Sequence, residues 1–443
     1  MDRTVVVGSR RKVSRRRFLT AAGAGVAGAA LLRMSPWEAG VAPAQMKGTT
    51  LRILTWNHFV PDYDTYFDQF AADWGKENGV TVRVDHNPQL QLPARIASEA
   101  AAGAGHDIFL FQGQILLRLY YQHLVDITDL IDKIGTQYGG WLLPARNLGV
   151  VEGRWYGVPD FYICIPMLYR KDLLAEAGMT RVPDTWDGWR AFGRTMKLKG
   201  HQAGMAVSHC NDANHNWRAL FYDFGVKETD PTGKEILWDS KELREGMRYA
   251  RALWEETMTS EVFSWDDASD NRLLDSSVAC WIHDAISAMR SIEKPNPTLY
   301  SKCEIANEPL GPKGRFNVVD SNVFSIWKFS KNIPGARAFL EAYGSRVKEH
   351  SVASKGYNMP FVRDAYKKPM PILGEDPKFN VLQDWNSVAR TFGFPGPVTA
   401  PAAEVLATYV VPDMVGRYFR GGDLEASIGW GMEQIKGIYA KYK

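Results

Sequence analysis

The sequence predicts an α/β fold with mostly parallel sheets and crossover helices. Three stretches with the apolar pattern of strands are separated by two stretches with helical spacing, and this β-α-β-α-β order is typical of a parallel sheet. With 443 residues, 45% of them hydrophobic, the chain exceeds one ordinary core, so we expect two or three lobes. The strands are expected at residues 51–56, 80–84 and 107–111, and the helices at 66–76 and 94–104.

The rest of the chain continues to alternate between the two patterns. Thr185 follows Pro183 and Asp184 and suits a helix N-cap, because its hydroxyl can accept hydrogen bonds from the first turn. The last hundred residues are expected to form helices separated by loops, because Pro and Gly interrupt the helical pattern there. We expect a hairpin at 153–158, strands at 161–169, 278–282 and 318–327, and helices at 173–178, 185–199, 216–224, 241–258 and 333–343.

Composition narrows the classes of function. The formal net charge is only +3, and no basic stripe follows residue 50, so the chain lacks the footprint of a nucleic-acid binder. Fifteen Trp and eighteen Tyr form a high aromatic load that suits a binding cleft. The four cysteines lack metal-site spacing. Cys164 and Cys280 lie in apolar runs and are expected to be buried thiols, while any disulfide pairing stays open.

The N-terminus has the features of an export signal. Residues 1–17 are rich in Arg, residues 21–32 are small and apolar, and Ala42-Pro43-Ala44 suits a signal peptidase site. Residues 14–19, SRRRFL, are similar to the twin-arginine motif. We therefore expect a signal peptide at 1–44, cleavage after Ala44, and export by the twin-arginine translocase to the periplasm or another extracytoplasmic space. No Cys follows the apolar stretch, so no lipid anchor is expected.

Three blocks of sequence occur in the order and at the spacing of one known family. Residues 97–111 read ASEAAAGAGHDIFLF. Residues 156–159 read YGVP, and LYRKDLLAEAGMTRVPDTWDGW follows at 168–189. Residues 325–343 read SIWKFSKNIPGARAFLEAY. The chain therefore resembles the bacterial extracellular solute-binding proteins, family 1, which serve carbohydrate importers.

This resemblance implies an architecture and a function. The family has a two-lobe, type II-like periplasmic-binding-protein fold, in which a ligand cleft lies between the lobes. Lobe one would comprise residues 48–157 and 318–356, and lobe two residues 158–317 and 357–443. The protein would be a monomeric, non-catalytic component of an ABC importer. It would close over a sugar, oligosaccharide or polyol by hinge motion and deliver it to the transmembrane subunits, without a cofactor.

Candidate ligand-binding residues are polar and aromatic side chains beyond strand ends. Aromatic rings cover the C–H faces of sugars, and Asp, Asn, Gln and His pair with their hydroxyl groups. A loop at 208–217 and the expected lobe crossings add to those that follow the strands. The candidates are Trp56, Asn57, His58, Gln112, Gln114, Asp160, Tyr162, Asp212, Asn214, His215, Trp217, Trp281, His283, Asp284, Ser321, Asn322, Tyr357 and Asn358.

Other readings of the same residues are weaker. Residues 54–61, LTWNHFVP, also look like the start of polyamine binders, but three candidate carboxylates among many amides favour a neutral polyol. A glycoside hydrolase would need two carboxyl groups about 5 to 9.5 Å apart. His283 and Asp284 are neighbours on a strand and point to opposite faces, so no catalytic residue is assigned. His209, Asp212 and His215 lack a convincing fourth ligand, so no metal is expected. An adhesion role has no repeats to support it.

Overall fold

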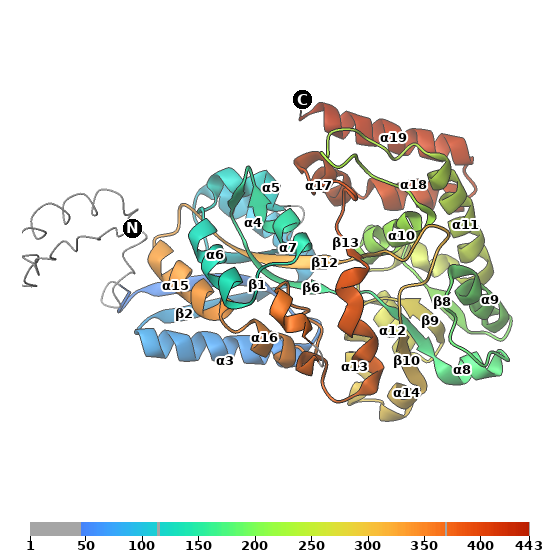
Figure 1. Cartoon of the computed structure of the whole chain (residues 1–443), viewed down its shortest axis with the longest axis horizontal. Helices are drawn as coiled ribbons and strands as arrows, with labels where there is room; N and C mark the ends of the chain where they lie inside the picture. The colour runs from blue at the N-terminus through green and yellow to red at the C-terminus, as the bar shows by residue number, and fades with distance from the viewer. Residues whose placement is uncertain (1–45, 113–115, 368–369, 443) are drawn as a thin grey trace, which may run out of the picture. The chain divides into compact units, whose positions relative to one another are not determined.

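The computed structural model describes residues 46–112, 116–367 and 370–442, and Gly48–Lys443 form one compact unit. This unit is built on two sheets flanked by helices (Figure 1). The expected signal peptide, residues 1–44, lies outside the described residues. In the part of the chain that is described, no helix combines the length and apolarity needed to cross a membrane.

The first sheet has the strand order β2-β1-β3-β12-β6. The expected parallel arrangement is confirmed for three strands, because β1 runs parallel to both β2 and β3. The strand β12 is antiparallel to β3 and to β6, so this edge of the sheet is mixed. The five strands are β1 (Thr50–Trp56), β2 (Thr81–Asn87), β3 (Ile108–Gln112), β6 (Val158–Ile163) and β12 (Asp320–Ile326).

Helix α3 (Pro61–Asn78) shows why the first crossover forms. Its buried residues recur at helical spacing, and among them Phe67 stacks on Phe324 of β12 with ring planes 5° apart. The helix ends at Gly79, whose φ of 68° is left-handed and favours glycine. Helices α4 (Leu92–Ala102) and α15 (Ile333–Gly344) follow the expected patterns at 94–104 and 333–343 within two residues.

The second sheet has the order β10-β7-β9-β8, and only β8 and β9 are parallel. Its strands are β7 (Met167–Arg170), β8 (Gln202–Gly204), β9 (Ala279–His283) and β10 (Cys303–Ala306). Helix α9 (Trp186–Lys197) begins as predicted, with Thr185 accepting a hydrogen bond from the Gly188 N–H. The C-terminal helices α17 (Ala400–Ala407), α18 (Val410–Phe419) and α19 (Leu424–Ala440) pack together, and α18 also contacts α10 (Asn211–Phe224).

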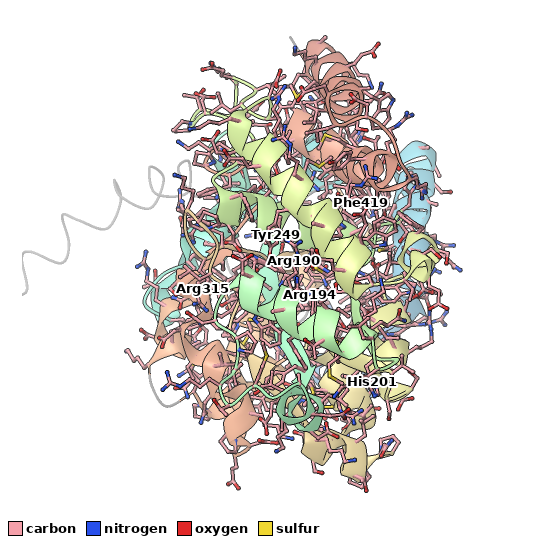
Figure 2. The ribbon with its side chains drawn as sticks, turned by 90° about the vertical axis from the view of Figure 1, so that its right-hand side faces the viewer. Arg190, Arg194, His201, Tyr249, Arg315 and Phe419 are labelled. Carbon is pink, nitrogen blue, oxygen red and sulfur yellow. The ribbon has the colours of Figure 1, made fainter. Side chains whose placement is uncertain are left out.

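Helices α9 and α11 (Lys241–Thr257) lie side by side over the second sheet (Figure 2). Arg190 of α9 donates to Glu256 of α11, and its guanidinium lies over the Tyr249 ring at 5.3 Å. Trp254 of α11 stacks on Phe419 of α18 with ring centroids 5.3 Å apart. These contacts fix the outer helices to one another, and α9 in turn packs against β8 and β9.

Two expectations about the elements are wrong. The predicted strand at 161–169 is two strands, because β6 ends at Ile163 and β7 begins at Met167 in the other sheet. Strand β6 therefore belongs to the first sheet, although the sequence-based lobe boundary fell just before it. The predicted loop at 208–217 is largely the start of α10, which begins at Asn211.

The remaining elements connect these layers. All four cysteines, Cys164, Cys210, Cys280 and Cys303, are buried free thiols, which confirms the expectation for Cys164 and Cys280. The shorter helices and strands are α5 (Leu116–Tyr120), α6 (Thr128–Gln137), α7 (Leu143–Gly149), β4 (Val150–Val151), β5 (Arg154–Trp155), α8 (Lys171–Glu176), α12 (Ser269–Asp275), α13 (Ser287–Glu293), α14 (Pro297–Lys302), β11 (Asn317–Val318), α16 (Val347–Ala353) and β13 (Ala389–Arg390). The 3-10 helices span Gln89–Gln91, Tyr121–His123, Ser260–Ser264, Arg363–Tyr366, Pro371–Leu373 and Pro377–Ser387.

Candidate functional site

An aromatic cluster lies at the carboxyl end of β1. The Trp56 ring is 4.9 Å from the His58 ring and 6.4 Å from the rings of both Phe161 and Tyr357. The segment after α16 comes close because Met359 and Tyr162 exchange backbone hydrogen bonds of 2.9 and 3.0 Å. The structure thus brings together the predicted Trp56, His58 and Tyr357, and we call these three residues with Phe59 and Phe161 the Trp56 cluster.

A row of polar candidates crosses the first sheet beside this cluster. Asn322 of β12 pairs in register with Gln112 of β3 on one side and with Phe161 on the other. Ser321 pairs with Tyr162, whose hydroxyl bonds the Tyr366 hydroxyl. Because Phe161 pairs with Asn322, Asn322 adjoins the Trp56 cluster, whereas Ser321, its neighbour along the strand, faces the other side of the sheet. Gln114 lies outside the described residues.

Buried groups fix the imidazole of His58. Its Nδ1 accepts from the Val60 N–H at 2.8 Å, so its Nε2 is the donor toward Asn358 Oδ1 at 2.9 Å. Burial lowers the pKa of His58 to about 4, which keeps the ring neutral at neutral pH. Asn57, which lies between Trp56 and His58 in the sequence, is exposed, and its backbone N–H donates to the Asn87 carbonyl.

Asp160 belongs to a buried network inside the first sheet's layer. Its Oδ1 accepts from the Tyr343 hydroxyl at 2.5 Å, and the hydroxyls of Tyr343 and Tyr63 lie 2.6 Å apart. Burial raises the pKa of Asp160 to about 7. The carboxyl group is therefore held by tyrosines of α3 and α15, which favours a structural role.

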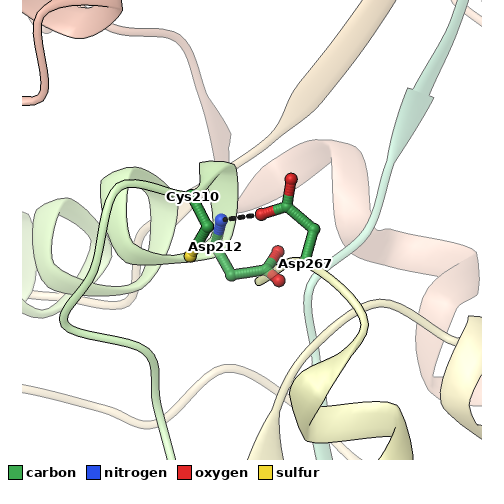
Figure 3. A group of neighbouring side chains, drawn as sticks. All are labelled: Cys210, Asp212 and Asp267. Carbon is green, nitrogen blue, oxygen red and sulfur yellow. Dashed lines mark hydrogen bonds between the residues drawn. The ribbon is translucent and has the colours of Figure 1, made fainter. Parts of the chain in front are cut away.

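Four carboxyl groups gather at the carboxyl edge of the second sheet. Carboxylate oxygens of Asp212, Asp270 and Asp284 lie within 4.8 Å of one another, and we call these three the carboxylate cluster. Asp267 lies beside it and accepts from the N–H groups of Asn211 and Asp212 at 2.6 and 3.2 Å, which stabilises the start of α10. Figure 3 shows the bond from Asp212.

The environment of these carboxyl groups favours their neutral form. Burial, together with the neighbouring Asp267, raises the pKa of Asp270 to about 8. The pKa of Asp284 is raised well above its ordinary value by burial and by the nearby Asp270. The pKa of Asp267 is also raised, again chiefly by burial. Positive charge placed here would reverse this tendency.

Two other predicted ligand-binding residues, both near the second sheet, are part of the hydrophobic core. Trp217 has an exposed fraction of 0%, donates its indole N–H to the Ala206 carbonyl, and meets Phe419 edge-on. Trp281 is equally buried and donates to the Trp189 carbonyl at 3.1 Å. These placements favour a core role for both rings.

Asn214, His215 and His283 also bond to the protein itself. The Asn214 side chain accepts from Arg218 at 2.6 Å and donates to the Leu406 carbonyl. His215 Nδ1 is 2.6 Å from the Asn211 carbonyl, and His283 Nε2 is 2.8 Å from Glu308 Oε2. His209 bonds Asp413 instead, so His209, Asp212 and His215 do not form one cluster.

Sequence reasoning missed Asp267 and Asp270. Both lie in the segment SWDDASD, at 264–270, at the start of a short helix that precedes β9. An acidic residue in a helix's first turn is ordinarily a stabilising surface feature, so nothing local marks this segment. The signal that could have found it is its position, because α12 packs against β9 and begins near the edge where Asp284 follows that strand.

Comparison with known proteins gives a family. Residues 60–346 match the family described as bacterial extracellular solute-binding protein. A putative binding protein of Brucella abortus (strain 2308) is 21% identical over 272 residues, which are 60% of this chain and 65% of that relative. A putative binding protein of Brucella suis biovar 1 (strain 1330) matches equally. The chain thus spans about 65% of the length of these curated relatives.

Solved structures of low identity share the two-lobe fold. The maltose-bound MalE3 of T. maritima has a TM-score of 0.75 at 19% identity, covering 88% of this chain and 100% of that one. A Thermotoga lettingae TMO solute-binding protein bound with alpha-D-tagatose has a TM-score of 0.76 at 18% identity, with the same coverage. A ribitol complex from Agrobacterium radiobacter K84 has a TM-score of 0.73 at 16% identity, covering 88% of this chain and 99% of that one.

Proposed function

Because this chain belongs to the family of bacterial extracellular solute-binding proteins, we propose that it is the solute-binding component of an ABC importer. Its ligand is a sugar, oligosaccharide or polyol, and its partners are the importer's transmembrane subunits. The observation that carries this choice is the Trp56 cluster, whose Phe161 pairs in register with Asn322 of β12 and whose His58 bonds the amide of Asn358. Rings for C–H faces next to amides for hydroxyl groups are the chemistry that a neutral polyol needs. No residue is assigned a catalytic role.

The mechanism we propose is closure of the two lobes over the solute. The chain passes from the first sheet to the second at residues 164–166, and it returns between Ala306 of β10 and Asp320 of β12. Connections between lobes are where hinge motion is absorbed in two-lobe proteins. The solute stabilises the closed state because it contacts both lobes only there, so binding shifts the population that the transmembrane subunits recognise.

The finer parts of the proposal concern export and assembly. The leader at 1–44 directs the folded chain to the twin-arginine translocase, signal peptidase cleaves after Ala44, and the mature protein is a monomer without a lipid anchor. We place lobe one at residues 48–163 and 320–356, and lobe two at residues 164–319 and 357–443. The shift from residue 157 to 163 is supported by the pairing of β6 with β12.

The test is a binding screen on the purified exported protein. Thermal shift and calorimetry against sugars, polyols and polyamines should find a selective neutral polyol, because a ligand of the folded state raises the midpoint by mass action. Trp56→Ala should weaken that binding, and Trp430→Ala, on the distant helix α19, should leave it unchanged. A solute that is chemically altered during the assay would overturn the proposal, as would a screen in which only non-polyols bind.

A further inference from the structure

The carboxylate cluster draws its members from three separate elements. Asp212 lies in the first turn of α10, Asp270 in the first turn of α12, and Asp284 directly after β9. Side chains from three places along the chain are therefore brought within 4.8 Å at their oxygens. Like charges at this distance repel strongly away from water, so chance packing would not favour the arrangement.

The burial of the cluster is the second observation. Asp270 has an exposed fraction of 0% and Asp284 of 2%. In Asp270, Oδ1 accepts from the Asn271 N–H at 3.0 Å, while Oδ2 finds no hydrogen-bond partner among the described residues. The Oδ2 of Asp284 is likewise unmatched within the described ranges. Buried carboxyl oxygens without partners are costly, and proteins usually match them with a cation.

The position of the cluster is the third observation. The strands β8 and β9 are parallel, and both the Asp284 segment and the segment leading to α10 follow their carboxyl ends. Parallel strands in α/β proteins bind ligands beyond their carboxyl ends, and β8 and β9 are the parallel pair of this otherwise antiparallel sheet. The carboxyl oxygens without hydrogen-bond partners thus lie beyond the ends of β8 and β9, where a ligand is expected, and not in the middle of the sheet.

We propose that Asp212, Asp270 and Asp284 form a subsite for one positively charged group. Two sources share this chemistry, a hard divalent metal ion and a protonated amino group of the transported solute. Oxygens at this spacing can surround a calcium ion at about 2.4 Å or an ammonium nitrogen at about 2.8 Å. The amino-group source rests on the proposed function, because it assigns the solute a charge; the metal source stands without it.

The experiment uses calorimetry on the exported protein after chelation and dialysis. The probes are Ca²⁺, Mn²⁺ and spermidine, with glucosamine titrated against glucose. We expect one class of cation to bind, and Asp270→Asn with Asp284→Asn to weaken it about ten-fold or more, since two of three anionic partners are lost. Asp275→Asn, at the exposed end of the same helix, is the matched control and should bind as the wild type does.

The double variant should also be folded, which keeps the test decisive. Removing two repelling buried carboxyl groups should raise the midpoint of the cation-free protein while abolishing the shift that the cation gives. The subsite is refuted if neither metal ions nor amines bind, or if the double variant binds them as tightly as the wild type. A neutral sugar that binds alone refutes the subsite and leaves the proposed function standing. If amines bind and no sugar or polyol does, the subsite is supported and the proposed function is overturned.

Discussion

His58 donates its Nε2–H to Asn358 Oδ1 at 2.9 Å, across 300 residues of sequence. The bond joins the end of β1 to the segment that follows α16. Both side chains are buried, and the two rings next to them, Trp56 and Tyr357, are the core of the Trp56 cluster. This hydrogen bond between neutral groups, together with the backbone bonds between Met359 and Tyr162, therefore joins the two segments that form the proposed sugar-binding surface.

Removing this bond should destabilise the fold. Asn358→Ala leaves the buried Nε2–H of His58 without its acceptor, which costs about 1–3 kcal/mol. Urea unfolding followed by circular dichroism measures the loss. Asn386→Ala, at an exposed position, should change the stability by less than about 0.5 kcal/mol. Equal effects of the two variants would show that the bond contributes nothing.

The second prediction concerns the pH dependence that Asp160 imposes. Its pKa is about 7 in the folded protein against an ordinary 3.8, so the folded state holds a proton that the unfolded state has released. Stability attributable to this group is complete below pH 3.8 and falls by about 1.4 kcal/mol per unit until pH 7, about 4 kcal/mol in all. Asp160→Asn removes this dependence and keeps an acceptor for Tyr343.

The measurement must be the difference between the two proteins at each pH. His58 acts in the opposite sense, since its pKa of about 4 is below its ordinary 6.5 and its neutral form stabilises the fold as pH rises through that interval. Both proteins contain His58, so the difference isolates Asp160. The Asp160→Asn variant should gain stability relative to wild type as pH rises, and parallel curves from pH 4 to 7 would contradict the assignment.

Trp217→Ala should destabilise the protein as a core deletion does. Its ring is fully buried between Ala206 and Phe419, so the truncation leaves a cavity that costs about 3–5 kcal/mol. Thermal unfolding with and without the solute separates this from a binding effect. Trp430→Ala, only partly buried against the core, should cost clearly less. A stable Trp217→Ala protein with weakened binding would return this ring to the site.

Asn317 offers a test of the connection between the sheets. Its Nδ2 donates to Glu308 Oε2 at 2.5 Å and to the Ile165 carbonyl at 2.7 Å, within the first chain crossing. Asn317→Asp places a second carboxyl group against a buried one and should cost about 3 kcal/mol or more. Asn317→Ala removes these donors and the Oδ1 that accepts from the Trp385 indole N–H, without adding a charge, and should cost about 1–3 kcal/mol. Denaturant unfolding compares them, and the opposite order would refute the network.

The export route can be tested in the precursor. Replacing Arg15 and Arg16 by Lys keeps the positive charge of the leader but removes the paired arginines that the twin-arginine motif requires. We expect the uncleaved precursor to accumulate in the cytoplasm, as seen by cell fractionation and immunoblotting. Replacing Lys12 by Arg, outside the motif, is the control. Efficient export of the double-Lys protein would contradict this route.

The sequence was most informative where structure is local. The strands β1 and β2 and the helix α3 were predicted because their apolar periods differ and Gly79 separates them. The pairing of β12 with β3 and β6 was missed because partners over 150 residues apart leave no local pattern. The break at 164–166 was missed because Cys164 and Ile165 continue the apolar run across two sheets.

The candidate site was predictable only in part. Trp56, His58 and Tyr357 meet because polar and aromatic residues after strand ends converge at one edge of a sheet. The start of α10 was missed because Cys210 gives no side-chain cap, while Asp267 supplies one from elsewhere in the chain. The burial of Trp217 follows from that longer helix, since its ring then faces the core.

The four buried thiols carry a consequence for the order of events in the cell. Cys164, Cys210, Cys280 and Cys303 reach their final environments without forming a disulfide. The polypeptide therefore requires no oxidant to mature and can finish folding among the reductants of the cytosol. Because no disulfide has to form, the protein can fold completely before it leaves the cytosol. A transport system that carries folded proteins requires this.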